Sequence, residues 1–366
     1  MTPFVLSEVC GRIGCITLDR PKALNSLSLE MVRSLHTTLQ VWRNDDKIDA
    51  VLIKSSNGRA FCAGGDIRFF YEAGHATPMA GSALLEDFFT EEYALNHLIH
   101  FYPKPYIALM DGVVMGGGMG IAQAGPEARL RIVTERTKMA MPEVNIGLFP
   151  DVGGSYFLTR APQQLGTYLA ISGETIAASD ALFANLADVF VPSTELPALI
   201  DYICQQSAAN GQDIRQLVRN FAAPFAAQAL PEKSLLAEHA SRIEQVFSQT
   251  SIARIINALV QDGSRFALQT LHAINQRSPL MMSVTLEQLR RGREMSVAEC
   301  LRMERSMVRH NFTHGEVLEG VRALVIDKDN TPRWNPNNLA DIDQAMIARF
   351  FVSAWPAHAH PLRHLD

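Results

Sequence analysis

The sequence contains little of what marks a disulfide-rich, redox or zinc protein. Cysteine occurs five times in 366 residues, an odd number, and no two cysteines form a CxxC pair. This pattern indicates reduced thiols in a reducing compartment rather than a disulfide framework. An HExxH motif is missing, and three histidines near the C-terminus (His358, His360 and His364) are too sparse a pattern to predict a metal site. The sequence therefore predicts neither a metal ion nor a redox role.

The sequence also contains neither a long apolar run nor a large excess of acidic or basic residues. The longest uncharged stretch, residues 112–126, is too short and too rich in glycine to span a bilayer, and no basic segment followed by an apolar block marks a signal peptide. The net charge is −5 without a basic run, which disfavours nucleic acid as a partner. We expect a small-molecule substrate, no membrane and no nucleic acid. The expected compartment is the cytoplasm, or an organellar matrix if a transit peptide has been removed.

What the chain does have is enough apolar sequence for a large core. Hydrophobic residues make up 47% of the 366 residues and charged residues 19%, and this length suggests about two domains. Short apolar runs at 14–18, 51–53 and 106–110 predict strands. Ser28 opens a predicted helix whose apolar residues recur at helical spacing: Met31, Leu35, Leu39 and Trp42. Strands and helices that alternate through glycine-rich turns predict the α/β class.

The character of the sequence changes near residue 196. Glycine becomes rarer and helical periodicity dominates, so we predict helices over 234–247 and 264–273. Residues 296–299 (SVAE) form a capping box, which places a helix start near Cys300. The chain is accordingly divided into two regions: an α/β core, residues 1–203, and a helical C-terminal region, residues 204–366.

The first of three glycine-rich turns covers residues 61–66 (FCAGGD) and precedes a helix predicted over 67–73. Adjacent glycines leave main-chain N–H groups uncovered, and a helix N-terminus adds positive potential. A tight turn that needs positive φ explains the same residues without a ligand. Taken alone, this turn favours the structural explanation.

The second turn, residues 115–120 (MGGGMG), follows the strand predicted at 106–110. It does not satisfy GxGxxG, so a dinucleotide site is weakly supported. The alternative is one wall of an oxyanion hole, in which peptide N–H groups from two separate turns point at one developing oxyanion. Loss of a single such donor typically raises the barrier by roughly 3–4 kcal/mol.

The third segment, residues 141–154, carries Glu143 and Asp151 in otherwise uncharged, apolar sequence. Its prolines and glycines disfavour a regular helix. Burial among apolar side chains should raise the pKa of both carboxyls, which suits acid–base or nucleophilic work. Structural acceptors for loop amides are the alternative. No GxSxG elbow or local Cys/His pairing offers another route to ester cleavage.

FCAGGDI, MGGGMG and MPEVNIGLFPDVGG, in this order, resemble the crotonase (enoyl-CoA hydratase/isomerase) superfamily. The resemblance implies a spiral of ββα units followed by helices. It also implies an oxyanion hole, made by the N–H groups of Gly65 and Gly117, that holds a thioester carbonyl oxygen. Coenzyme A would enter as part of the substrate, without a separate cofactor. Its implied contacts are the adenine with Ala63, Asp66 and Ile67, and a phosphate with Lys22, which is otherwise a solvated loop lysine.

Departures from the hydratase pattern point to one group of this superfamily. Hydratases carry a glutamate where this chain has Gly120, and tend to have glycine where it has Asp151. Glu143 with Asp151 resembles the 3-hydroxyisobutyryl-CoA hydrolase group, as does the segment 319–334. Glu92, in the run Glu-Glu-Tyr, matches the substrate-binding glutamate of that group.

This resemblance implies hydrolysis of a small 3-hydroxyacyl-CoA thioester in valine breakdown. Glu143 would attack the carbonyl directly, which we favour, or activate a water molecule. Asp151 would hold the 3-hydroxyl or the hydrolytic water, or protonate the leaving thiolate.

Two alternatives stay open. One is a hydratase or isomerase in which Asp151 replaces the absent glutamate. The other is a non-catalytic acyl-CoA-binding protein, which the cost of burying unneeded carboxylates argues against. The oligomeric state is open: crotonases are often trimers or hexamers, so a homo-oligomer fits the resemblance.

Overall fold

The computed structural model describes residues 4–77, 81–210, 213–314 and 316–366. The chain forms two compact units, each assembled from three separate segments. Unit 1 comprises Met1–Gly65, Leu95–Met139 and Ile176–Glu238, and unit 2 comprises Asp66–Ala94, Ala140–Thr175 and His239–Asp366. The boundary predicted between residues 203 and 204 falls within helix α8 (Leu196–Asn210) of unit 1. The division into 1–203 and 204–366 stays a prediction drawn from composition.

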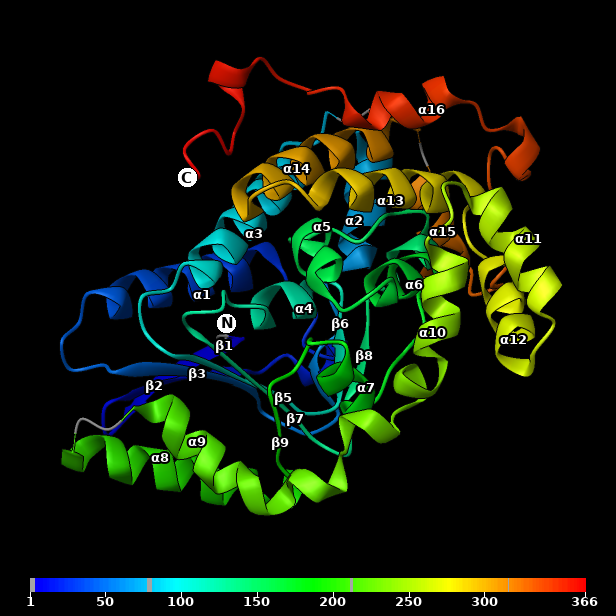
Figure 1. Cartoon of the computed structure of the whole chain (residues 1–366). Coiled ribbons are helices and arrows are strands. Elements are labelled where there is room, and N and C mark those ends of the chain that lie inside the picture. Colours follow the sequence, from blue (N-terminus) through cyan, green and yellow to red (C-terminus); the bar gives the residue numbers. More distant parts are fainter. Residues whose placement is uncertain (1–3, 78–80, 211–212, 315) are drawn as a thin grey trace. The chain divides into compact units, whose positions relative to one another are not determined.

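Unit 1 is built on a sheet that runs through its centre (Figure 1). In the described part of the chain, six strands form it in the order β1 (Val5–Cys10), β2 (Ile13–Leu18), β3 (Ala50–Ser55), β5 (Tyr106–Met110), β7 (Arg129–Val133) and β9 (Val189–Phe190). β1 and β2 form an antiparallel hairpin, and the remaining neighbours pair in parallel. The strands predicted at 14–18, 51–53 and 106–110 are therefore confirmed.

Helices cover the sheet of unit 1 on both faces, as Figure 1 shows for α1 on one side and α8 with α9 on the other. Alternate residues of the inner strands pack against α8 and α9 (Ile214–Ala222): Ile13, Cys15, Ala50, Leu52, Ile107, Leu109, Leu130 and Ile132. Because side chains alternate between faces along a strand, the intervening residues point to the other side. Burial on both faces explains the continuous apolar strands of the sequence.

Helix α1 (Leu29–Arg43) begins where the sequence predicted. The Ser28 hydroxyl accepts a hydrogen bond from the main-chain N–H of Met31 at 3.3 Å, which satisfies a donor that the first helical turn leaves free. The predicted apolar stripe is buried: Met31, Leu35, Leu39 and Trp42.

A second, smaller sheet carries the glycine-rich turns. Three short strands of the described chain form it in the order β4 (Ala60–Cys62), β6 (Val113–Met115) and β8 (Lys138–Ala140). The remaining helices of unit 1 are α4 (Gly117–Ala122) and α7 (Ala178–Phe183).

Unit 2 is mainly helical. Its helices are α2 (Ile67–Ala76), α3 (Ala83–His100), α5 (Gly154–Phe157), α6 (Leu165–Ser172), α10 (Leu235–Phe247), α11 (Ile252–Asp262), α12 (Arg265–Ile274), α13 (Pro279–Gly292), α14 (Val297–His314), α15 (Glu316–Val321) and α16 (Gln344–Ala348). Helices α3 and α10 contribute residues to both units.

Three helix predictions in the second half can be compared with these bounds. Helices α10 and α12 confirm those at 234–247 and 264–273. The capping box is also present: the N–H of Ser296 donates to Glu299 at 2.8 Å, and the N–H of Glu299 donates to the Ser296 hydroxyl at 3.2 Å. The helix it opens begins at Val297, slightly ahead of the predicted start near Cys300.

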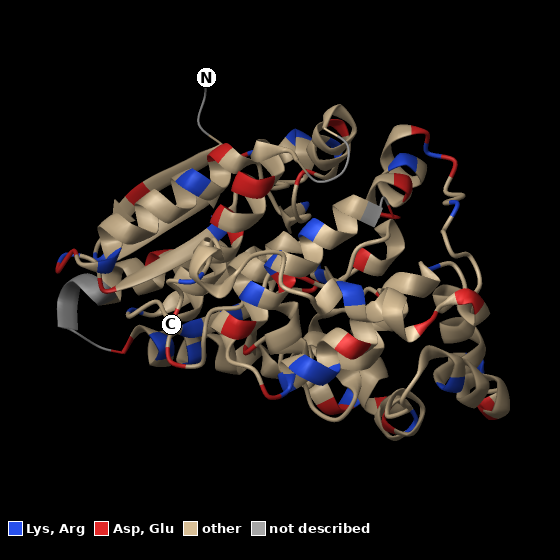
Figure 2. Cartoon of the chain, turned by 90° about the horizontal axis from the view of Figure 1, so that it is seen from above, with Lys and Arg blue, Asp and Glu red and all other residues tan. Residues whose placement is uncertain are grey.

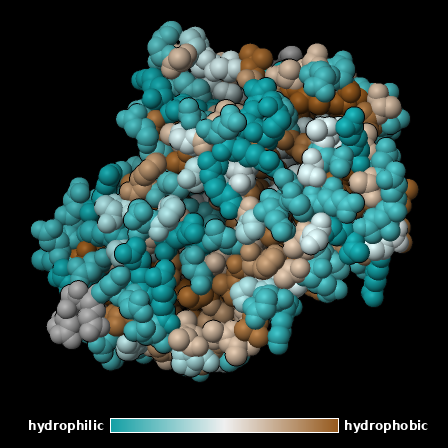
Figure 3. Space-filling model, in the orientation of Figure 1, coloured by the Kyte–Doolittle hydropathy of each residue, from teal (hydrophilic) through white to brown (hydrophobic). Residues whose placement is uncertain are grey.

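Acidic and basic residues are interspersed along the ribbon in Figure 2 rather than gathered by sign. The face of the molecule seen in Figure 3 is predominantly hydrophilic, with smaller apolar areas between polar ones. None of the described helices is both long enough and apolar enough to cross a membrane.

Candidate active site

The two shorter glycine turns pack backbone to backbone within unit 1. A Cβ atom on Gly64 would lie 3.2 Å from the Met115 carbonyl oxygen and 3.6 Å from the nitrogen of Gly117, and one on Gly118 would lie 2.2 Å from the Cys62 carbonyl oxygen. Gly64 also has a φ of +102°, which side chains rarely tolerate. Only glycine therefore lets the turn carrying Gly65 meet the turn carrying Gly117.

Gly117 is the first residue of α4, so its N–H has no acceptor within the helix. The loop that carries Lys22 is tied to the Gly65 turn, since the N–H of Ala63 donates to the Leu24 carbonyl at 3.0 Å. Lys22 itself is exposed and lies in the short 3₁₀ helix η1 (Pro21–Ala23). Unit 1 thus groups the main-chain segments of Lys22, Ala63, Gly65 and Gly117.

Two predicted adenine contacts, Asp66 and Ile67, belong to unit 2. Asp66 is the N-cap of α2, and its carboxylate accepts from the N–H of Phe69 at 3.3 Å. Ile67 is the first residue of that helix and is half-buried. The cap explains why an acidic residue follows the glycine pair, and the adenine contact stays a prediction.

Unit 2 gathers buried carboxyls, here called the carboxyl cluster: Glu92 on α3, Glu143 on the 3₁₀ helix η2 (Glu143–Ile146), Asp151 before α5 and Glu304 on α14. Their exposed fractions are 2%, 6%, 5% and 0%. The three acids predicted as site residues thus lie in one unit and are buried, as the apolar character of 141–154 indicated. Their catalytic and binding roles stay predictions.

Asp151 is bound to Tyr93, the residue after Glu92. The Tyr93 hydroxyl donates to the Asp151 carboxylate at 2.6 Å, and the ring is fully buried. Burial raises the pKa of Asp151 to about 6, and the hydrogen bond from Tyr93 opposes part of this rise. Burial and the negative charge of Asp151 raise the pKa of Tyr93 well above its usual value, so this hydroxyl remains a donor.

Glu143 and Glu92 are the least satisfied members of the cluster. Burial, followed by the charge of Asp151, raises the pKa of each carboxyl well above its ordinary value. One oxygen of each side chain (Oε2 of Glu143 and Oε1 of Glu92) is buried without a hydrogen-bond partner among the described residues. Such atoms are rare in folded proteins, and a donor from an ordered water or a bound ligand would satisfy them.

The carboxyl cluster retains protons at neutral pH. Burial raises the pKa of Glu304 to about 8, and the charges of Asp151, Glu304 and Glu92 all raise the pKa of Glu143. Interacting acids of this kind titrate as a group, so some are protonated while others are ionised. The arrangement therefore offers a proton donor and a proton acceptor in one buried place, which suits acid–base chemistry.

Tyr93 and Glu304 were not predicted as site residues. Glu304 has a signal in the sequence: it shares the buried face of α14 with apolar residues at helical spacing, Cys300, Leu301, Met307 and Val308. A charged residue on such a face requires a buried partner. Nothing local to Tyr93 distinguishes it from an ordinary core aromatic.

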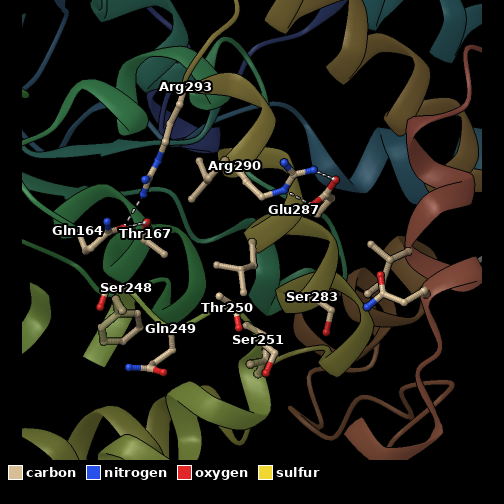
Figure 4. A pocket seen from close by; sticks show the side chains of 16 residues that line it. Gln164, Thr167, Ser248, Gln249, Thr250, Ser251, Ser283, Glu287, Arg290 and Arg293 are labelled. Atoms are coloured by element: carbon tan, nitrogen blue, oxygen red, sulfur yellow. Dashed lines mark hydrogen bonds and ion pairs between the residues drawn. The ribbon is translucent and has the colours of Figure 1, made fainter. Parts of the chain in front are cut away.

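A separate cavity of about 320 Å³ lies in unit 2 between α6, the α10–α11 loop, α13 and α16 (Figure 4). Arg293 reaches across it to Gln164 at 2.7 Å, and Arg290 is paired with Glu287 at 2.7 Å. Its lining includes no member of the carboxyl cluster. Within residues 4–77, 81–210, 213–314 and 316–366, no group of three or more His, Cys, Asp or Glu side chains is placed to hold a metal ion.

Comparison with known proteins gives one family across the chain. The sequence model of the enoyl-CoA hydratase/isomerase family matches residues 13–351. The "3-hydroxyisobutyryl-CoA hydrolase, mitochondrial" of Xenopus tropicalis is 42% identical over 94% of this chain and 87% of that protein. The protein of the same name from Homo sapiens is 39% identical over 95% of this chain and 88% of its own length. These names do not support the cytoplasmic compartment expected from the sequence.

Two solved structures are similar along nearly the whole chain. A carnitinyl-CoA dehydratase from Mycobacterium thermoresistibile is 36% identical with a TM-score of 0.87, covering 96% of this chain and 97% of its own. An enoyl-CoA hydratase from Rhodobacter sphaeroides 2.4.1 is also 36% identical, with a TM-score of 0.84 and coverage of 96% and 98%. The predicted α/β fold of the crotonase type, with a helical C-terminal region, is thereby confirmed.

Proposed function

Because the chain belongs to the enoyl-CoA hydratase/isomerase family, we propose that its carboxyl cluster hydrolyses the thioester of 3-hydroxyisobutyryl-CoA or of a closely related small 3-hydroxyacyl-CoA. The products are the free 3-hydroxy acid and coenzyme A. Coenzyme A enters as part of the substrate, and the proposal needs no separate cofactor. The curated relatives that carry the hydrolase name align over nearly the whole chain, which supports this choice within the family.

One observation supports the proposal most directly: Glu92 and Glu143 each keep a buried oxygen without a partner, beside the ionisable Asp151. A 3-hydroxyl group is a hydrogen-bond donor and can satisfy such an oxygen. A catalytic water can satisfy the other. A saturated acyl group without the hydroxyl would leave one carboxyl unsatisfied, so we expect the cluster to select 3-hydroxyacyl substrates.

The proposed reaction places each residue in one role. The N–H groups of Gly65 and Gly117 hold the thioester oxygen while Glu143 attacks the carbonyl carbon, or removes a proton from the water that does so. The reacting form is the one in which Glu143 is ionised and a proton of the coupled carboxyl cluster lies on Asp151. The C–S bond then breaks, and Asp151 gives this proton to the thiolate. If Glu143 attacks directly, water hydrolyses the resulting anhydride and restores the carboxylate.

A hydratase is the second candidate, since the two similar solved structures are those of a carnitinyl-CoA dehydratase and an enoyl-CoA hydratase. Addition of water across a double bond needs two positioned acid–base groups. The position of the first family glutamate is Gly120 here, a buried residue of α4 without a side chain. Asp151 would have to replace it, so hydrolysis is the simpler use of these residues.

A thiol-release assay on a small panel of acyl-CoA thioesters tests the proposal. The panel contains 3-hydroxyisobutyryl-CoA, 3-hydroxypropionyl-CoA, isobutyryl-CoA and crotonyl-CoA. Release of thiol from the two 3-hydroxy substrates supports the hydrolase. Loss of enoyl absorbance without thiol release selects the hydratase, and no reaction with any substrate selects a binding protein.

Replacement of Glu143 by glutamine tests its assignment. The amide is neither a nucleophile nor a base, so kcat/KM for thiol release should fall about 10²–10⁴-fold. Acyl-CoA binding, measured by calorimetry, should persist because the shape of the side chain is kept. Full thioesterase activity in Glu143→Gln would remove the residue from the mechanism.

The compartment and assembly belong to the proposal as well. The vertebrate relatives are named mitochondrial, which favours an organellar matrix over the cytoplasm for this chain. A homo-oligomer remains the expected assembly from the family resemblance. Sedimentation of the purified chain measures it.

A further inference from the structure

The turn that carries Asp151 has an unusual backbone. Val152 has a φ of +52° and Gly153 has a φ of +88°. A β-branched residue in the left-handed region is a true outlier, because its Cβ substituents crowd the backbone. Such a conformation persists only where the surrounding structure determines it more strongly than the local preference opposes it.

Glu304 holds the C-terminal side of this turn. Its carboxylate accepts hydrogen bonds from the N–H of Gly153 at 2.8 Å and from the N–H of Ser155 at 2.9 Å. The side chain is fully buried on α14, in the same unit as the turn. One carboxylate oxygen thus accepts from the residue before Gly154, and the other accepts from the residue after it.

Gln288 of α13 holds both ends of the same turn. Its amide nitrogen donates to the Pro150 carbonyl at 2.5 Å and to the Ser155 hydroxyl at 2.8 Å. The Asp151 side chain is held separately, by Tyr93 of α3. Side chains from three helices therefore fix a strained segment whose only acidic residue is Asp151.

We propose that Glu304 is a positioning residue for the reaction: by accepting both N–H groups as a carboxylate, it imposes the strained turn that sets the place of the Asp151 carboxyl. This role rests on the proposed hydrolase function, since it acts through Asp151 and not on the substrate. It also explains why an acidic residue occupies the apolar face of α14.

The proposal makes the turn sensitive to the charge of Glu304. A carboxylate accepts from both N–H groups, whereas a protonated carboxyl or an amide has one oxygen for one of them and directs a hydrogen at the other. Burial raises the pKa of Glu304 to about 8, although the bonds from Ser155 and Gly153 lower it in part. The titratable groups whose charges act with Glu304 are Asp151, Tyr93, Glu143 and, on its own helix, Cys300.

The test compares wild type with Glu304→Gln, which resembles the protonated side chain in shape and charge. We expect the ratio of wild-type to variant kcat/KM to grow at least tenfold as pH rises from 6 to 9, because only the wild type gains the second acceptor. Hydrogen exchange at the amides of Gly153 and Ser155 should be at least tenfold faster in the variant at pH 9. The exchange measurement does not require activity, so it remains informative if the proposed function fails.

Asp180→Asn is the matched control. Asp180 is also buried and accepts two main-chain N–H groups, from Leu236 at 2.9 Å and Ala177 at 3.3 Å, but it belongs to unit 1. This variant should alter stability without changing the pH dependence of activity or the exchange of residues 153 and 155. If Glu304→Gln does not fold, the wild type alone is measured: exchange at the amides of Gly153 and Ser155, corrected for the intrinsic effect of pH, should become at least tenfold slower between pH 6 and pH 9, and no change would overturn the proposal.

A pH-independent activity ratio, or unchanged exchange at residues 153 and 155, overturns the positioning role. Loss of activity in Asp180→Asn with the same pH signature would also overturn it, because a general loss of stability would then explain both variants. Absence of thiol release by the wild type refutes the proposed function, and exchange alone then decides whether Glu304 holds the turn.

Discussion

Asp151 is an ionisable residue in a buried position, where burial disfavours its charged form. The pKa of this carboxyl rises from its ordinary value of 3.8 to about 6, mainly because burial disfavours the ionised form. One pKa unit equals about 1.4 kcal/mol, so ionised Asp151 lowers the stability of the fold by about 3 kcal/mol near neutral pH. Residues retained at such a cost are commonly those that function requires.

Asp151→Asn should therefore raise stability and abolish function. We expect a gain of about 1–2 kcal/mol at pH 8, less than the full electrostatic cost because the charged hydrogen bond from Tyr93 is weakened. Urea unfolding of both proteins measures it. At pH 4.5 wild-type Asp151 is protonated, and the difference should shrink. A variant less stable than wild type at pH 8 would contradict this account of the carboxyl cluster.

At the same scale, the sequence predicted Glu143, Asp151 and Glu92 but not Tyr93 or Glu304. Glu143 and Asp151 were predicted because they interrupt an otherwise apolar segment, and Glu92 was predicted from the family resemblance. The partners of Asp151 and Gly153 lie 58 residues earlier and 151 residues later in the chain. No local pattern encodes a hydrogen bond over such separations.

At the scale of elements, α15 packs directly on η2, the short helix that begins with Glu143. A Cβ atom on Gly320 of α15 would lie 2.3 Å from the carbonyl carbon and oxygen of Ile146. These are main-chain atoms, which cannot move aside without moving η2. Because Gly320 has no side chain, α15 can approach the main chain of η2, the candidate catalytic segment, this closely.

Gly320→Ala should destabilise the protein by about 1–3 kcal/mol, the usual range for overpacking, and reduce thiol release by displacing Glu143. Thermal unfolding and kcat measure the two effects. Gly74→Ala is the matched control, because Gly74 also lies in a helix of unit 2 but its added Cβ would meet the flexible end of Leu318 at 2.7 Å. Equal losses in both variants would argue against a specific contact between α15 and η2.

Elements with strong local signals were the predictable ones. The caps at Ser28, Ser264 and Ser296 and the apolar strands of unit 1 are each encoded within a few residues. No helix was predicted over α3, which carries Glu92 and Tyr93. Buried side chains occur around much of its circumference, so the apolar spacing that identifies a surface helix is weak there.

At the scale of the whole molecule, composition predicted a division by position along the chain, whereas contacts group segments that are far apart in sequence. Residues 66–94 belong with residues 239–366, although two segments of unit 1, Leu95–Met139 and Ile176–Glu238, lie between them in the sequence. Composition averages over neighbours in the sequence and carries no record of which distant segments pack together. The fold class was predictable from the alternation of strands and helices and from the family resemblance, whereas no local pattern records which distant segments form one unit.

The carboxyl cluster should also set the pH dependence of global stability. A carboxyl with a raised pKa binds its proton more tightly in the folded state, so stability is highest below its ordinary pKa and falls as pH rises through the folded value. With Asp151 at about 6 and Glu304 at about 8, the free energy of unfolding should decrease between pH 5 and pH 9. Urea midpoints across this range measure it, and a rise toward pH 9 would contradict the assigned shifts.

The interleaved segments also bear on how the protein is made. The ribosome delivers Glu92, Glu143 and Asp151 well before Glu304, which follows Gly153 by 151 residues. Until then the turn at Val152 lacks the carboxylate that accepts its amides, so in a nascent chain stalled before α14 this turn is incomplete. The turn can therefore gain the hydrogen bonds to Glu304 only after α14 has been synthesised, and not in the order in which its own residues leave the ribosome.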